Sequence, residues 1–193
     1  MAQTLLNLTN GVRGKIDLET DVTGTLGTSH YTAGSGISMA DSWRLTTLQT
    51  YNAAGTYDFD DDWEQADDAN FEVIGNGLLE VDGEFYFQQT GKFLVNFNLT
   101  VQRRQSTNSS YNGMSCQVST NSGTNYDSLA EASVFTRNPD GAYNSASASC
   151  IFDVPNSSTF RMKFSTTTHN GYVRGGDSAQ NVTGFTIIRL GDT

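Results

Sequence analysis

The stretch "FYFQQTGKFLVNFNLTV", from Phe85 to Val101, decides the fold of this chain. Apolar side chains occupy every second position, on the same parity before and after a short polar break at 88–91, and the positions between them are mostly polar. Such a period of two is typical of a β-strand with one face in a core and the other near water. The stretch therefore predicts two antiparallel strands joined by a glycine-containing turn. The core is predicted to include Phe85, Phe87, Phe93, Val95, Phe97 and Leu99.

The chain on both sides of this stretch predicts further short strands joined by tight turns. It contains 19 glycines and only two prolines, and Asn-Gly and Asp-Gly pairs separate its apolar segments. Strand-like segments lie at 42–50, 70–75, 77–81, 112–119, 129–136, 145–154, 159–165, 171–174 and 182–190. At most one helical turn is indicated, at Ser128–Ala132. About eight to ten strands with this spacing favour an all-β sandwich or jelly roll.

The first part of the chain differs from the rest. Glycines interrupt residues 1–40, and no period is sustained there, so this segment cannot build a core of its own. The sequence therefore predicts an extended N-terminal arm over 1–40 and one β-sandwich domain over 41–193. The arm has more aliphatic residues than a free linker needs, and we expect it to order on binding to another surface. Its predicted anchors are Leu5, Leu6, Leu8, Val12, Ile16 and Leu18.

Composition excludes several classes of function. The net charge is −10 and the only basic cluster is Arg103-Arg104, so nucleic-acid binding is not expected. No apolar run reaches the length of about 18 residues that a membrane span needs, and the N-terminus does not resemble a secretory signal. Cys116 and Cys150 both fall on core-facing positions of alternating segments. We expect them to be free thiols, although the sequence leaves a disulfide between them open.

The segment "DFDDDWEQADD", 58–68, is the sharpest local feature. Its alternate aspartates have the first spacings of a calcium-binding loop, but Trp63 stands where such a loop needs glycine and Ala69 where it needs a bidentate glutamate. We interpret the segment as a solvated acidic loop. The alternative is a weak, partial calcium site formed by Asp60, Asp62 and Glu64.

No motif of an enzyme is present. The two histidines, His30 and His169, do not fall in a catalytic or zinc-binding pattern, and no phosphate-binding glycine loop occurs. We therefore expect neither catalysis nor a cofactor. A glycan hydrolase using two carboxylates is an alternative without positive support. Tyrosines near the predicted turns are suited to a glycan-binding or subunit surface because their rings are apolar and their hydroxyls polar; these are Tyr111, Tyr126, Tyr143 and Tyr172.

Several segments resemble one family. The aromatic strand, the Thr-Gly turn and "KFLVNFNLTV" at 92–101 resemble a strand of tumour-necrosis-factor-like jelly rolls, the fold of complement collagen-like head domains. The segments "SASCIFDVPNSSTFRMKF" at 147–164 and "VTGFTIIRL" at 182–190 are similar to the last strands of that fold. The sequence over 40–93 resembles a variety of this module in structural proteins of marine bacteriophages. The segment at 7–28 resembles those that precede such knobs in phage fibre proteins.

The resemblance implies a jelly-roll β-sandwich that assembles as a homotrimer and binds rather than catalyses. It further implies a location on the virion surface, assembly in the cytoplasm of the host bacterium, and contact with other virion proteins of the capsid or tail. Two roles stay open. The chain is either a capsid decoration (cement) protein or short head or neck fibre, which the short arm favours, or a tail-fibre knob that recognises a glycan on the host surface.

Overall fold

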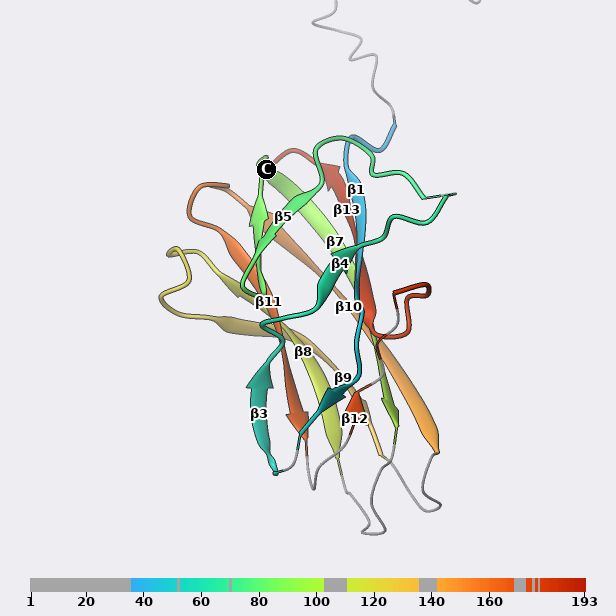
Figure 1. Ribbon diagram of the computed structural model, residues 1–193. Coiled ribbons are helices and arrows are strands. Elements are labelled where there is room, and N and C mark those ends of the chain that lie inside the picture. Colours follow the sequence, from blue (N-terminus) through green and yellow to red (C-terminus); the bar gives the residue numbers. More distant parts are fainter. Residues whose placement is uncertain are drawn as a thin grey trace, which may run out of the picture. The chain divides into compact units, whose positions relative to one another are not determined.

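The computed structural model describes residues 36–51, 53–69, 71–102, 111–135, 142–168, 173–174, 176 and 178–193. Every regular element in these residues is a β-strand, which confirms the predicted all-β class (Figure 1). The strands are β1 (Ala40–Leu45), β2 (Gln49–Thr50), β3 (Gly55–Asp58), β4 (Trp63–Gln65), β5 (Leu78–Val81), β6 (Glu84–Phe87), β7 (Gly91–Gln102), β8 (Asn112–Ser119), β9 (Asp127–Val134), β10 (Tyr143–Val154), β11 (Arg161–Thr168), β12 (Val173–Arg174) and β13 (Gly184–Gly191). The described residues contain no helix with the length and apolar character needed to cross a membrane.

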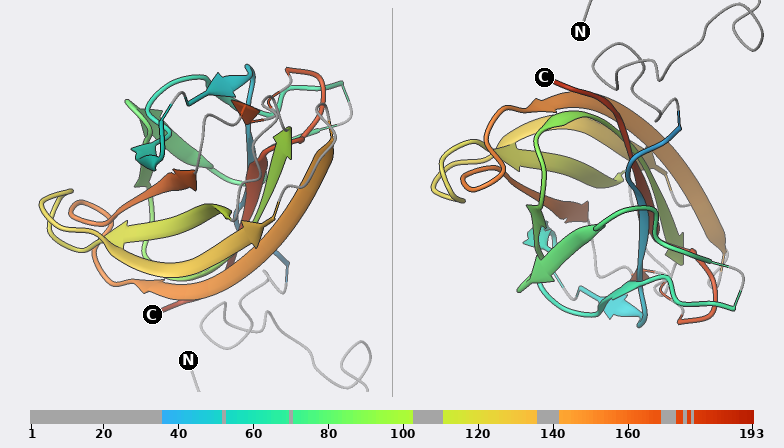
Figure 2. Two further views of the ribbon diagram at one scale, coloured as in Figure 1. Left: turned by 90° about the horizontal axis from the view of Figure 1, so that it is seen from below. Right: turned by 90° about the horizontal axis from the view of Figure 1, so that it is seen from above.

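The strands form two antiparallel sheets that face each other (Figure 2). Sheet A has the order β2-β12-β7-β13-β1-β4, and β10 pairs along the other edge of β7. Sheet B has the order β5-β6-β11-β8-β9, and β3 also pairs with β11. The first strand, β1, thus lies beside the last, β13, and the chain passes repeatedly from one sheet to the other. This connectivity is that of a jelly roll, as the sequence predicts.

Two local expectations need correction. Ser128–Ala132, where the sequence indicates a helical turn, lies in β9, because pairing with β8 outweighs the local preference of these residues. The domain also begins earlier than residue 41. It starts at Gly36, since Met39 is buried and its carbonyl accepts a hydrogen bond from the N–H of Arg189 in the last strand.

Other expectations concern residues that are not described. The predicted arm anchors Leu5, Leu6, Leu8, Val12, Ile16 and Leu18 lie outside the described residues, as do His30, His169 and Tyr172.

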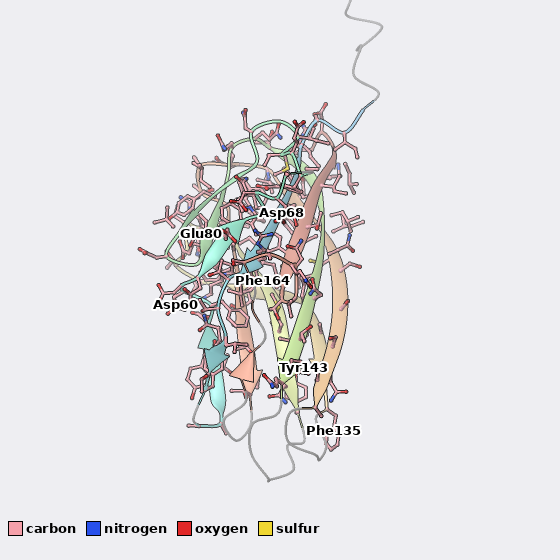
Figure 3. The ribbon with its side chains drawn as sticks, turned by 45° about the vertical axis from the view of Figure 1, so that its right-hand side comes forward. Asp60, Asp68, Glu80, Phe135, Tyr143 and Phe164 are labelled. Carbon is pink, nitrogen blue, oxygen red and sulfur yellow. The ribbon has the colours of Figure 1, made fainter. Side chains whose placement is uncertain are left out.

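Aromatic rings from both sheets fill the centre of the sandwich. Trp63 and Phe185 come from sheet A and Phe85 and Phe164 from sheet B, and their ring centroids lie 4.8–6.2 Å apart (Phe164 is labelled in Figure 3). Most of these pairs meet edge to face, the geometry that the charge distribution of aromatic rings favours. The alternation of the opening stretch is present as predicted. Its buried side chains are Phe85, Phe87, Phe93, Val95, Phe97 and Leu99.

A buried carboxylate joins the two sheets. Asp41 is 1% exposed, and its oxygens accept hydrogen bonds from the backbone N–H groups of Ser42 and Leu78, at 2.8 Å each. They also accept from the indole N–H of Trp43 at 2.9 Å and from the amide of Gln65 at 2.9 and 3.0 Å. These donors lie in β1, β4 and β5, so one side chain ties sheet A to the edge of sheet B.

A buried cation holds the acidic segment against the sheet. Arg44 is 1% exposed although it points away from the core, because the chain after β4 covers it. Its guanidinium contacts Glu64 at 2.9 Å, Asp67 at 2.9 Å and Asp68 at 2.6 Å. Burial opposes the charge, but the hydrogen bonds to Asp68 and Glu64 outweigh burial and raise the pKa of Arg44.

Arg44→Met should lower the free energy of unfolding by about 2–3 kcal/mol, because it removes the cation and leaves three carboxylates crowded together. Asp67→Asn is the matched control, since the side chain of Asp67 is 75% exposed and two other carboxylates stay in place. It should cost less than about 1 kcal/mol. Urea denaturation measures both values. Equal effects of the two substitutions would show that the network does not hold this segment.

Candidate functional site

The central part of the outer face of sheet A is a wide surface without charge. The outward-facing residues of β10, β7 and β13 lie in register across the sheet, as Ser149, Asn96 and Thr186 do. We call these residues the neutral face; they are Leu94, Asn96, Asn98, Thr100, Ser145, Ser147, Ser149, Ile151, Thr186 and Ile188. None of the ten is charged, although the chain as a whole carries a net charge of −10.

An apolar row crosses this surface from one edge of sheet A toward the other. Ile151 pairs with Leu94, Leu94 with Ile188, and Ile188 with Ala40. The row continues to Ile74 through an isolated bridge to Ala40. Ile151 is 64% exposed and Ile74 is 43% exposed. Single exposed aliphatic residues are ordinary, but a continuous row of five, two exposed and three half-buried, is suited to contact with another apolar surface.

Among the described side chains on the outer side of sheet A, charges lie at the margins of the neutral face. Lys92 and Asp153 face each other across β7 and β10 at one end. Arg44 lies in register with Gly184 on the same outer side, but its charge is buried under carboxylates. Charge depletion at the centre with polar groups around it is typical of protein–protein interfaces. This surface can therefore bind a flat, complementary partner.

The neutral face was not among the surfaces predicted from the sequence. A signal is nevertheless present, because the outward positions of 145–151 are three serines and an isoleucine, all uncharged. The extent of the neutral face depends on the register of three strands that are distant in the sequence.

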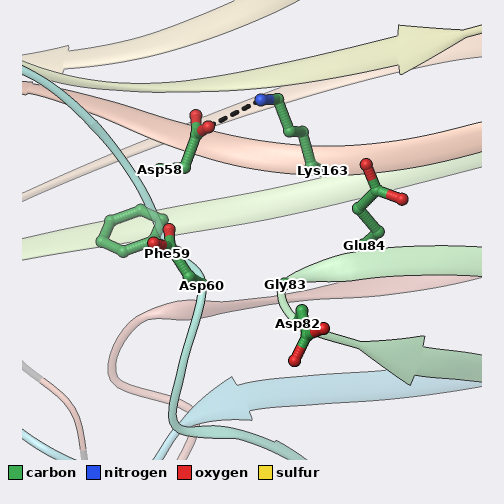
Figure 4. A pocket seen from close by; sticks show the side chains of 7 residues that line it. All are labelled: Asp58, Phe59, Asp60, Asp82, Gly83, Glu84 and Lys163. Carbon is green, nitrogen blue, oxygen red and sulfur yellow. Dashed lines mark hydrogen bonds and ion pairs between the residues drawn. The ribbon is translucent and has the colours of Figure 1, made fainter. Parts of the chain in front are cut away.

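The acidic segment contributes to a second feature, a pocket of about 300 Å³ on the outer side of sheet B (Figure 4). It is lined by Asp58, Phe59, Asp60, Asp82, Gly83, Glu84 and Lys163. The turn between β5 and β6 forms one wall. Gly83 has a φ of +78°, and a Cβ there would lie 2.3 Å from the carbonyl oxygen of Phe59, so the close approach of this turn requires glycine.

The polar groups around the pocket largely satisfy one another. Lys163 donates to Asp58 at 2.7 Å and lies 4.4 Å from the ring centre of Tyr126. Tyr126 donates a short hydrogen bond to Glu84, and burial, followed by this contact, raises the pKa of Tyr126. Burial also raises the pKa of Asp60, assisted by the neighbouring charges of Asp58 and Asp61.

The three residues considered for calcium have separate surroundings. Asp60 lines the pocket. Asp62 accepts hydrogen bonds from Thr47 at 2.6 Å and from Gln49 at 2.7 Å, while Glu64 binds Arg44. Alternation along β4 sends Trp63 into the core and Glu64 to the outer side. No group of three His, Cys, Asp or Glu side chains in the described part of the chain has an arrangement that could hold a metal ion.

Comparison with solved structures gives the fold. The chain is similar to the tumour necrosis factor Eiger of S. frugiperda, with a TM-score of 0.59 and 13% identity, over 82% of this chain and 96% of that one. It is also similar to murine APRIL at pH 5.0, with a TM-score of 0.56 and 12% identity, over 79% of this chain and 98% of that one. The fold is therefore a TNF-like jelly-roll sandwich. No protein-family model and no curated protein matches the sequence.

Calcium should leave the melting temperature unchanged. A site with micromolar affinity in millimolar calcium would add about 4 kcal/mol of stability, which a thermal scan detects easily. We expect wild-type protein in millimolar calcium and in chelator to melt within about 1 °C of each other. A large rise in calcium that disappears in Asp60→Asn would contradict this expectation. Asp60 is the residue to change, because the carboxylate of Asp62 accepts structural hydrogen bonds.

Proposed function

We propose that this chain is a non-enzymatic surface protein of a bacteriophage virion, which assembles as a homotrimer and decorates the capsid or forms a short head or neck fibre. The observation that carries the proposal is the neutral face, because an extended uncharged surface with an apolar row is suited to contact with another protein. The resemblance of segments 7–28 and 40–93 to phage structural proteins supports the virion location, with assembly in the host bacterial cytoplasm.

The trimer is supported by the fold and by the composition of β13. TNF-like jelly rolls are usually trimeric. In β13, Phe185 and Ile187 point into the core while Ile188 points outward, so this strand carries apolar residues on both sides. Strands of this kind are normally covered on both faces. A second copy packed on the neutral face supplies the outer cover, and a three-fold ring closes such head-to-tail contacts.

The two ends of the sandwich differ in a way that suits anchoring at one end. The described chain starts and ends at the same end, where Arg189 contacts Ser38 and Met39 (Figure 1). At the other end, β7 finishes and β10 begins, with Gln102 paired to Tyr143. A trimer attached through its N-terminal segments therefore displays the second end outward.

Two exposed aromatic residues favour the alternative role, a tail-fibre knob that binds a host surface glycan. Phe135 follows β9 and is 47% exposed, and Tyr143 starts β10 and is 61% exposed. Both lie at the displayed end (Figure 3). Partly exposed aromatic side chains are suited to contact with sugars. Labelling the chain on intact virions separates the two roles, because the first predicts label over the head or neck and the second predicts label at the tail tip.

Ile151→Asp should dissociate the trimer, because it places a charge in the centre of an apolar contact. Leu79→Asp is the matched control, since Leu79 is a similarly exposed aliphatic residue, at 56%, on a strand of sheet B. Light scattering should give about three chain masses for the wild type and for Leu79→Asp, and about one for Ile151→Asp. A folded wild-type monomer at micromolar concentration would overturn the trimer, and loss of the trimer in Leu79→Asp alone would move the interface to sheet B.

Deletion of residues 1–35 should abolish attachment to the virion without unfolding the domain. The cut falls before Gly36 because Met39 belongs to the core. We expect the truncated protein to remain trimeric in light scattering and to fail to bind particles that lack the native protein. Full-length protein is the positive control. Undiminished binding of the truncated protein would assign docking to the β-domain.

A further inference from the structure

Asn-Gly occurs four times in the chain, and two of these pairs lie in the described residues, at 76–77 and 112–113. Asparagine followed by glycine is prone to cyclisation, because glycine has no Cβ to hinder attack of its backbone nitrogen on the asparagine side chain. Asn112 is fully buried in β8, and its side-chain oxygen accepts a hydrogen bond from Thr168 at 3.0 Å. Gly113 pairs with Thr167 on β11 and with Ser133 on β9, so the sheet holds the second pair from both sides.

The first pair, Asn76 and Gly77, lies in the turn that leads into β5 and belongs to no strand. Asn76 is exposed, and its side chain makes no hydrogen bond to another described residue. The carbonyl oxygen of Asn76 accepts a hydrogen bond from the side-chain amide of Gln88 at 2.8 Å, which holds the backbone of the turn but not this side chain. The backbone N–H of Gly77 also donates to no described residue. The side chain and the backbone nitrogen that would react are therefore both free.

We propose that Asn76 converts spontaneously to isoaspartate and that this conversion loosens the attachment of β5 to sheet A. The Gly77 nitrogen loses its proton and attacks the side-chain carbonyl carbon of Asn76. The C–N bond of the side-chain amide breaks, and its nitrogen takes up a proton and leaves as ammonia. Water then opens the resulting succinimide ring. Attack on the backbone carbonyl gives isoaspartate and attack on the side-chain carbonyl gives aspartate, so in sum one amide is hydrolysed and one ammonia released.

Isoaspartate disturbs this position because it adds a methylene group to the backbone where the chain has no room. A Cβ on Gly77 would lie only 2.8 Å from the carboxylate of Asp41 and 3.1 Å from the amide of Gln65. The next residue, Leu78, donates its backbone N–H to Asp41 at 2.8 Å, and this bond ties the edge of sheet B to sheet A. A longer backbone displaces the donor and leaves the buried carboxylate less well satisfied. The inference does not depend on the proposed function.

The test is ageing of the folded full-length protein in mildly alkaline buffer, with mildly acidic buffer in parallel. The reaction should be faster in alkaline buffer, because a base must remove the Gly77 proton. Mass spectrometry of tryptic peptides reports the two pairs separately, since Asn76 falls in 45–92 and Asn112 in 105–137. We expect Asn76 to convert faster than Asn112 by about tenfold or more, because Asn112 reacts only after its strand opens. In denaturant the two pairs should react at similar rates.

Two variants connect the modification to stability, and labelling by an isoaspartate methyltransferase distinguishes isoaspartate from aspartate. Asn76→Ser cannot cyclise, and it is a mild change because the side chain of Asn76 is exposed. Asn76→Asp, measured fresh, adds the charge of the product without lengthening the backbone. Ageing should lower the melting temperature of the wild type by about 3 °C or more and leave that of Asn76→Ser unchanged. Fresh Asn76→Asp should melt like fresh wild type.

Three results would overturn the proposal. The first is an Asn76 that stays intact in folded protein while the denatured control reacts. The second is an Asn112 that reacts as fast as Asn76 in the folded state. The third is protein that carries isoaspartate at position 76 and still melts like fresh protein.

Discussion

The carboxylate of Asp41 is the constraint on which the arrangement of this domain depends. A buried negative charge without a cation beside it is costly unless hydrogen bonds satisfy it, and the four donors of Asp41 come from three strands. These hydrogen bonds determine the path of the chain between β1 and β5, because the backbone N–H of Leu78 can donate to Asp41 only if the backbone passes close to it. Gly77 permits that approach. It has a φ of +65°, and a Cβ there would lie 2.8 Å from the Asp41 carboxylate.

Charge is distributed unevenly over the two sheets, and this distribution favours some orientations of approach between two copies over others. Between Arg44 and Lys92 the chain contains no lysine or arginine but many carboxylates, which gather around β3, β4 and the β5–β6 turn. Copies that approach through these acidic surfaces repel one another. Copies that approach through the neutral face do not, so in the proposed trimer electrostatics selects the orientation and apolar contact supplies the affinity. The buried position of Arg44 contributes, because its three carboxylates keep a cation from appearing on the outer side of sheet A.

The sequence predicts the features that follow from the alternation of apolar and polar residues along one strand. It does not predict the features that depend on which residues of distant strands pair. The inward positions of β6 and β7 follow directly from a period of two, and so does the inward orientation of both cysteines. The aspartate spacing in 58–68 was less informative, because β4 turns Glu64 to the side of the sheet opposite Trp63. The neutral face needs pairing between strands that lie far apart in the chain. No pattern within one strand encodes which distant strands it pairs with. For this reason the candidate site was the least predictable part of the structure.

The pairing of β1 with β13 has a consequence for synthesis. Trp43 pairs with Phe185, so the innermost part of sheet A joins residues from the two ends of the domain. Contacts of such long sequence separation form slowly, because the chain must close a large loop before they contribute. They also cannot form until β13 has left the ribosome, after all the other strands of the domain. Until then the apolar strands made earlier lack their partner and are exposed to aggregation.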